Sequence, residues 1–181
     1  MLSLKEKIEN SFDVLVKEFK YKHKMEAPKI EKIVVSVGVG KYKDDKRKLS
    51  VIQDRISKIT GQKATYLLAK KSIASFKLRQ GQVVGYKVTL YGKKMIMFFD
   101  KFISIIIPRM RDFRGISNNS VDEMGNLTIG IKEHIIFPET GDEEIKDIFG
   151  LSITVVSSAS SKKEGLAFFK HLGIPFKKIK K

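Results

Sequence analysis

The sequence predicts an α+β domain of two layers, in which helices pack on one face of a mainly antiparallel sheet and leave the other face open and polar. Four segments alternate apolar and polar residues with a period of two, which indicates strands with one buried and one exposed face. Amphipathic helical segments lie between them and must cover the buried face. A hydrophobic share of 42% in 181 residues supplies enough apolar surface for a core.

Helix caps place the elements of the first half of the chain. Ser3-Leu-Lys-Glu6 is a capping box at the start of an amphipathic helix. Asp44 and Asp45 lie where a helix N-terminus favours negative charge, and Gly61 is suited to end that helix. The expected elements are a helix over 4–20, a strand over 30–37, a glycine loop over 37–40, a helix ending at Gly61, a strand over 63–68 and a basic loop over 69–82.

Proline, glycine and a second capping box organise the rest of the chain. Pro108 is expected to stop an apolar helix, because proline lacks the N–H that a helix interior needs. Ser161-Lys-Lys-Glu164 opens the last helix, which Gly173 and Pro175 end. The expected elements are a strand over 83–91, a helix over 93–107, a loop over 108–126, strands over 127–136 and 151–157, an acidic helix near 142–148, a helix from Ser161 to about His171 and a basic tail over 176–181. We expect residues 1–181 to form a single domain.

The open face of the predicted sheet carries side chains that suit RNA. Hydroxyl and ammonium groups donate hydrogen bonds, and an aromatic ring offers a stacking surface. The alternation places these residues there: Lys32, Ser36, Lys87, Thr89, Tyr91, Thr128, Lys132, His134, Ser152 and Thr154. A polar open face is also the default for any such sheet, so the pattern alone leaves both interpretations open.

Positive charge is concentrated in the middle of the chain. The formal net charge is +16. From Arg55 to Phe99 there is no carboxylate, although ten basic residues occur: Arg55, Lys58, Lys63, Lys70, Lys71, Lys77, Arg79, Lys87, Lys93 and Lys94. Surfaces normally intersperse both signs, so an uncompensated run of this length indicates a polyanionic partner such as a nucleic acid. The alternative is a basic protein without such a partner.

Two local clusters sharpen that hypothesis. In the loop over 69–82, Lys70, Lys71, Lys77 and Arg79 are interleaved with Ile73 and Phe76, so that cations can meet phosphates while an apolar side chain meets a base or ribose. Alternatively, Ile73 and Phe76 pack the loop onto its own sheet.

The second cluster is rich in arginine. Arg109, Arg111 and Arg114 are three of only six arginines, and the guanidinium fork suits bidentate contacts to phosphate or carboxylate. The alternative is pairing within the chain, to Asp112 and the acidic segment 139–147.

Several function classes are disfavoured. Without cysteine there is no disulfide, thiolate zinc site or cysteine nucleophile, which fits a reducing compartment. The histidines are scattered without ligand spacing, and the glycines near residue 38 lack the third glycine of a dinucleotide site. Asp142, Glu143 and Glu144 are interpreted as a helix first turn rather than as catalytic carboxylates. We expect neither an enzyme nor a metal or cofactor.

The chain also lacks a membrane signature. There is no apolar run of about 18 residues, and charges stand where a signal peptide is apolar, so a cytoplasmic protein is expected. Two rival functions remain: an RNA-modifying enzyme or another kind of RNA-binding module, and a membrane-surface module that uses the N-terminal helix. The acidic residues of that helix dilute its positive charge and disfavour the second rival.

Phrases along nearly the whole chain resemble the bacterial large-subunit ribosomal protein five family, which is associated with 5S rRNA. The matching phrases are Lys32-Ile-Val-Val-Ser-Val-Gly-Val-Gly40, Thr60-Gly-Gln-Lys63, Ala69-Lys-Lys-Ser-Ile-Ala74, Phe76-Lys-Leu-Arg-Gln-Gly81, Lys87-Val-Thr-Leu90, Pro108-Arg-Met-Arg-Asp-Phe-Arg-Gly115, Gly125-Asn126 and Gly130-Ile-Lys-Glu-His-Ile-Ile-Phe-Pro-Glu139.

The resemblance implies an α+β protein on 5S rRNA in the central protuberance, beside 23S rRNA and neighbouring large-subunit proteins. Gln62 and Thr89 match family RNA contacts, and Ser36 stands where the pattern usually has asparagine. Together with cations of the basic run and residues of the open face, these make up the expected rRNA-binding set: Lys32, Ser36, Gln62, Lys63, Lys70, Lys71, Lys87, Thr89 and Tyr91. The loop matches the segment that approaches P-site tRNA, through Ser72, Ser75, Phe76, Lys77, Arg79 and Gln80. The arginine loop matches the bridge to small-subunit ribosomal protein thirteen, through Arg109, Arg111, Asp112, Phe113 and Arg114.

Overall fold

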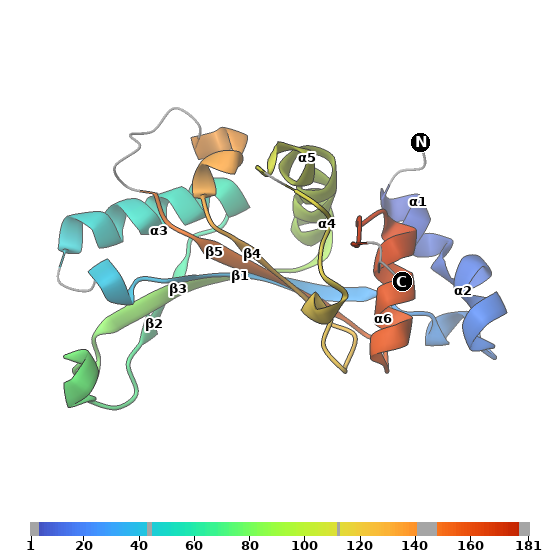
Figure 1. Cartoon of the computed structure of the whole chain (residues 1–181), viewed down its shortest axis with the longest axis horizontal. Coiled ribbons are helices and arrows are strands. Elements are labelled where there is room, and N and C mark those ends of the chain that lie inside the picture. The colour runs from blue at the N-terminus through green and yellow to red at the C-terminus, as the bar shows by residue number, and fades with distance from the viewer. Residues whose placement is uncertain (1–3, 43–44, 112, 141–147, 178–181) are drawn as a thin grey trace. The chain divides into compact units, whose positions relative to one another are not determined.

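The computed structural model describes residues 4–42, 45–111, 113–140 and 148–177, and these form the predicted α+β fold (Figure 1). Five strands make one sheet in the order β2-β3-β1-β5-β4. The strands are β1 (Ile30–Gly38), β2 (Thr65–Leu68), β3 (Val83–Leu90), β4 (Leu127–Ile131) and β5 (Leu151–Ser157). The helices are α1 (Leu4–Glu9), α2 (Ser11–Phe19), α3 (Lys46–Thr60), α4 (Gly92–Lys101), a π-helix over Phe102–Ile106, α5 (Ile107–Arg109) and α6 (Lys162–Leu172).

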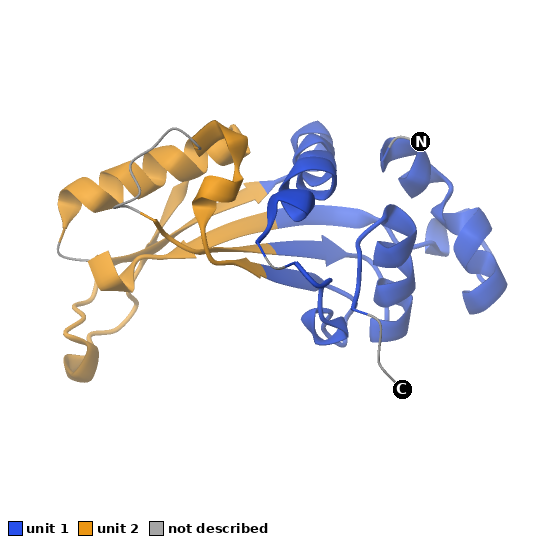
Figure 2. Ribbon diagram, turned by 45° about the horizontal axis from the view of Figure 1, so that its top comes forward, with its two compact units in different colours: residues 1–33, 90–129, 154–181 blue, residues 34–89, 130–153 orange. Residues whose placement is uncertain are grey.

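Contacts divide the chain into two compact units (Figure 2). Unit 1 comprises residues 1–33, 90–129 and 154–181, and unit 2 comprises residues 34–89 and 130–153. Within the described part of both units, no helix has the length and apolar composition that crossing a membrane requires.

Neighbouring strands run antiparallel, and the predicted alternation is confirmed. Across β2 and β3, Thr65 lies opposite Lys87 and Tyr66 opposite Tyr86. Alternate residues of β1, β4 and β5 are buried, and the residues between them are more exposed. The sheet therefore has one face that belongs to the core and one that reaches solvent.

Unit 2 is built on α3, whose predicted caps form. The Asp45 side chain accepts a hydrogen bond from the N–H of Lys48, and Gly61 ends the helix with a φ of 65°. The side chains of Ile52, Ile56 and Ile59 are buried, and the inward residues of the strands complete this core. The last residues of α3 lead directly to the turn that carries Gln62 and Lys63.

Unit 1 departs from two predictions about helix ends. The helix predicted over 4–20 is interrupted at Asn10, a residue type that competes with the helix backbone and favours caps. The helix predicted to stop at Pro108 continues to Arg109. A π-helical turn precedes Pro108 and shifts the hydrogen-bond register, so that the proline falls in the first turn of α5, where its missing N–H matters little.

His134 is not on the open face, which corrects the prediction from alternation. The strand ends at Ile131 rather than at residue 136, and His134 begins a 3-10 turn with its side chain fully buried. Its ring stacks on Phe149 with centroids 4.1 Å apart, and its Nε2 lies 3.4 Å from Nη1 of Arg55. The backbone N–H of Phe149 lies 3.4 Å from Nδ1, so each ring nitrogen faces an N–H donor, and the neutral ring can accept a hydrogen bond from one of them.

Some predictions fall outside the described residues. They concern Ser3, Asp44, Asp112, the acidic helix near 142–148 with Asp142, Glu143 and Glu144, and the end of the basic tail over 178–181.

Candidate nucleic-acid interface

The open face of unit 2 presents hydroxyl and ammonium groups on adjacent strands. Lys87 is exposed on β3, and Thr89 on the same strand is half-buried. On β1, the Ser36 hydroxyl lies 2.9 Å from that of Ser152 on β5. A hydroxyl has one donor and two acceptor sites, so this pair retains capacity for a further partner.

The structure brings Gln62 to Thr89, although they are far apart in sequence. The Gln62 side-chain N–H donates to the backbone carbonyl of Thr89 at 3.4 Å. The Thr60 hydroxyl contacts the carbonyl of Gln62 at 3.1 Å and holds the turn after α3. Exposed Lys63 follows in the same turn, so two residues that the resemblance assigned to RNA lie together beside a cation.

The loop over 69–82 is an ordered hairpin extension. Ile73 and Leu78 exchange two backbone hydrogen bonds of 2.9 and 3.1 Å, and the N–H of Ala69 donates to the carbonyl of Gln82 at 2.9 Å. Lys77 has a left-handed φ of 49° directly after the 3-10 turn over Ala74–Phe76. These bonds give the tip a defined shape that the sequence pattern did not predict.

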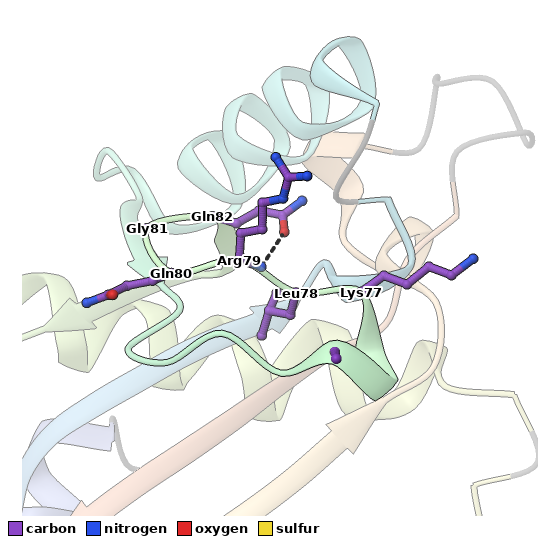
Figure 3. Close-up of a pocket in the computed structure, with 7 residues that line it drawn as sticks. Lys77, Leu78, Arg79, Gln80, Gly81 and Gln82 are labelled. Carbon is purple, nitrogen blue, oxygen red and sulfur yellow. Dashed lines mark hydrogen bonds between the residues drawn. The ribbon is translucent and has the colours of Figure 1, made fainter.

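The tip of this hairpin presents its side chains to solvent. Phe76 is 71% exposed, so its ring does not pack onto the sheet as the alternative required, and Ile73 is 41% exposed. Ser72, Ser75, Lys77, Arg79 and Gln80 are exposed as well. Residues 74 and 77–82 line a hollow of about 740 Å³, where the N–H of Arg79 donates to the Gln82 side chain at 3.3 Å (Figure 3).

Figure 3 shows the charged and polar side chains of the hairpin extending in different directions. Lys77 points away from the side on which Gln80 lies, and Arg79 extends beside Gln82. A strand of nucleic acid that met this tip would find cations on more than one side, together with an exposed aromatic ring.

Unit 1 carries the other predicted residues. Lys32 is half-buried on β1, and Tyr91 is 61% exposed in extended backbone just before α4. Arg109, Arg111 and Arg114 are exposed, whereas Phe113 is half-buried.

The C-terminal segment holds this arginine loop by a contact that sequence reasoning missed. The N–H of Ile116 donates to the carbonyl of Pro175 at 2.8 Å, and the N–H of Lys177 donates to the carbonyl of Ile116 at 2.9 Å. Gly115, with a φ of 91°, lies against the backbone of Lys177, which leaves no room for a Cβ atom. Arg114 is thus next to a braced backbone and near the start of the basic tail.

Arg55 and Lys58, the first two cations of the carboxylate-free run, both have polar partners within unit 2. Arg55 is buried beside His134, and Lys58 lies 2.9 Å from Asp54 one helical turn earlier. Lys58 is nevertheless exposed, as are the other eight cations, from Lys63 to Lys94. The exposed positive charge of the run therefore lies at the end of α3, in the turn after it, in the hairpin, on β3 and at the start of α4.

A further polar hollow of about 470 Å³ was not predicted. It lies beside Gln62 and Lys63 and is also lined by Ser50, Gln53, Asp54, Ser57, Gly61 and Tyr66. The sequence held one signal for it, an aromatic residue three positions after Lys63 within the carboxylate-free run. The half-exposed ring of Tyr66 is fixed there, because its hydroxyl donates to Oε1 of Gln53 at 2.9 Å.

Comparison with known proteins gives the same family along the chain. Residues 23–79 match the family described as ribosomal protein L5, and residues 83–176 match the model for the C-terminus of the same ribosomal protein family. Over 164 residues, the chain is 48% identical to large ribosomal subunit protein uL5 of Mycoplasma mycoides subsp. mycoides, covering 91% of each chain. Over 172 residues it is 48% identical to uL5 of Baumannia cicadellinicola, covering 95% of each. Over 163 residues it is 47% identical to uL5 of an Anaeromyxobacter species, covering 90% of this chain and 91% of the other.

Proposed function

The chain belongs to the uL5 family of ribosomal proteins, and on that premise we propose that it binds 5S rRNA and anchors it in the central protuberance of the large subunit. As a member of this family it is a structural constituent of the large ribosomal subunit and not an enzyme. Its partners include ribosomal RNA and other large-subunit proteins.

The observation that carries the proposal is the placement of the exposed cations. Lys63, Lys70, Lys71 and Lys87 are exposed within a stretch that contains no carboxylate, and the paired Gln62 and Thr89 lie among them. Cations supply the affinity for RNA by neutralising phosphates, while neutral donors and acceptors fix the register. This combination suits a folded RNA that is recognised by shape and backbone.

Two further contacts belong to the proposal. The exposed tip of the hairpin, with Phe76, Lys77 and Arg79, contacts P-site tRNA, since an aromatic ring beside cations suits a nucleotide. The loop with Arg109, Arg111 and Arg114 forms a bridge to small-subunit ribosomal protein thirteen, for which the braced backbone supplies a fixed support.

A titration of 5S rRNA with the full chain at several salt concentrations tests the proposal. If about 5–8 phosphates are neutralised, the plot of log affinity against log salt has a slope of about −4 to −7. A flat line, or equal affinity for an unrelated folded RNA of the same length, would contradict the proposed function.

A further inference from the structure

The hollow beside Gln62 and Lys63 has the size of a ligand site. Its volume of about 470 Å³ lies within the range of roughly 300–1,000 Å³ that small-molecule sites occupy. All the residues that line it belong to unit 2. It adjoins two residues of the proposed rRNA-binding set, yet none of the predicted contacts uses its interior.

The hollow contains an aromatic ring that is held in place and half-exposed. Tyr66 lies on β2 at the edge of the sheet and is 50% exposed. Its hydroxyl donates to Oε1 of Gln53, and its ring lies 5.5 Å from that of Tyr86, centroid to centroid. A fixed ring with an open side loses little conformational freedom when a planar group stacks on it.

The surrounding polar groups are arranged for a neutral partner. Gln53 is already engaged, because its side-chain N–H donates to the carbonyl of Ala64 at 3.2 Å while its oxygen accepts from Tyr66. Gln62 directs its side-chain N–H to Thr89, which leaves its carboxamide oxygen as the acceptor for an incoming N–H. Gln53 is therefore a positioning residue, and Gln62 is a contact residue.

The charged groups at the rim of the hollow favour a base inside it and a phosphate next to it. The Asp54 carboxylate lines the hollow and disfavours an anion inside it, even though Lys58 lies 2.9 Å away. Exposed Lys63 also lines the hollow and supplies a cation for a phosphate next to the inserted group.

We propose that this hollow receives one unstacked base of the bound rRNA, which stacks on Tyr66 and donates an exocyclic N–H to Gln62, while Lys63 contacts the adjacent phosphate. The inference rests on the proposed function, since it requires rRNA to lie across this edge of unit 2. Unstacked bases are the usual targets of sequence-specific RNA recognition, and each has a face that can stack on an aromatic ring. The chemistry selects a base with an exocyclic amino group: adenine, cytosine or guanine.

Variants of Tyr66 in the full chain, titrated with 5S rRNA, test this site. Tyr66→Ala is expected to weaken binding about 5- to 150-fold, the range for loss of one stacked base, without changing the salt slope. Tyr66→Phe keeps the ring and loses only the bond to Gln53, so it should retain most of the affinity. Leu68→Ala is the matched control, because Leu68 lies on the same strand and is 54% exposed but has no aromatic ring.

Base-specific probing with dimethyl sulfate gives a second readout. In the wild-type complex, one adenine or cytosine that reacts in free 5S rRNA should be protected, or one guanine should change its reactivity, and Tyr66→Ala should restore the reactivity of that base alone. Circular dichroism verifies that the variant is folded. Lys63→Ala should flatten the salt slope by about 0.9.

Four outcomes would overturn the inference. Unchanged affinity of Tyr66→Ala, or an equal loss in Leu68→Ala, excludes a stacking role for the ring while 5S binding itself stands. If Tyr66→Phe loses as much affinity as Tyr66→Ala, the loss comes from the hydroxyl and not from stacking. If the wild-type chain does not bind 5S rRNA at all, the proposed function fails and this inference fails with it.

Discussion

Replacing Lys87 by alanine removes one exposed cation from the open face and leaves the strand intact. Lys87 lies on β3 opposite Thr65 of β2, and its side chain is exposed. If it contacts an rRNA phosphate, its loss retains one counterion on the RNA, and the salt slope becomes less steep by about 0.9. The same relation gives an affinity loss of about eightfold at 0.1 M salt and about twofold at 0.5 M, because counterion release weakens as salt rises.

The assay is a set of binding isotherms for 5S rRNA between low and moderate salt. Lys58→Ala is the matched control, since Lys58 is also exposed but lies 2.9 Å from Asp54 and outside the proposed set. Its slope should equal that of the wild type. Parallel lines for the wild type and Lys87→Ala would refute the reasoning, because they would mean that Lys87 contacts no phosphate.

Three other predictions concern the fold and the hairpin. Gly165→Ala should lower the melting temperature by about 2–8 °C. The new Cβ would lie 2.7 Å from the Cα and 2.8 Å from the carbonyl oxygen of Gly125, and the cost of this overpacking exceeds the gain of about 1 kcal/mol in helix propensity. Tyr21→Phe should lower the free energy of unfolding by about 1.5–3 kcal/mol at pH 7, because it removes a 2.5 Å hydrogen bond to the Glu164 carboxylate. Denaturant titrations should show that the difference in unfolding free energy between the wild type and Tyr21→Phe shrinks above about pH 10. Deleting residues 72–80 should spare 5S rRNA binding and weaken the retention of P-site tRNA on ribosomes that carry the variant.

The pH dependence predicted for Tyr21→Phe follows from the direction in which the pKa of Tyr21 is shifted. Burial, then the hydrogen bond and charge of Glu164, raise the pKa of Tyr21 above its ordinary value. The folded chain therefore holds the phenol neutral while the unfolded chain ionises, so the contribution of Tyr21 is complete below the unfolded pKa and is lost as the pH rises through the folded pKa. A constant difference between the wild type and Tyr21→Phe from pH 7 to 11 would contradict this.

The predictions for Gly165→Ala and for the deletion of residues 72–80 can each be checked directly. Gly130→Ala adds a Cβ that meets nothing within 4 Å, so it should leave the melting temperature nearly unchanged. A higher melting temperature for Gly165→Ala would contradict the prediction, because it would mean that the turn at Gly125 can move to accommodate the added Cβ. Loss of 5S rRNA affinity in the 72–80 deletion, with the circular dichroism spectrum preserved, would reassign the hairpin to rRNA.

Signals carried within a few residues predicted the local structure well. The capping box at Ser161 forms with one change, because Glu164 accepts from the N–H and hydroxyl of Ser160 instead of closing onto Ser161 itself. The strand over 151–157 begins and ends where the alternation placed it. These features depend on neighbouring residues alone, so the chain order is sufficient to find them.

Features that depend on distant partners were missed. The burial of His134 needs Arg55 and Phe149, and neither is near it in sequence. The helix passes Pro108 because a π-helical turn changes its register, which the position of the proline alone does not indicate.

The candidate site divides in the same way. The exposed cations were predicted from the charge distribution along the chain, and the open-face hydroxyls from the two-residue alternation of the strands. The pairing of Gln62 with Thr89 and the fixing of the Tyr66 ring by Gln53 are tertiary contacts between segments 13 or more residues apart. The sequence pattern therefore indicates the kind of partner, and the fold is needed to show the shape of the contact.

Lysine accessibility in the complex with 5S rRNA tests the central claim most directly. Acylation of the free chain and of the complex, followed by mass spectrometry, reports which ammonium groups the RNA covers. We predict protection of Lys63, Lys70, Lys71 and Lys87, with Lys17 on α2 and Lys170 on α6 reacting equally in both states. Protection confined to α2 and α6, with the carboxylate-free cations as reactive as in the free chain, would contradict the account.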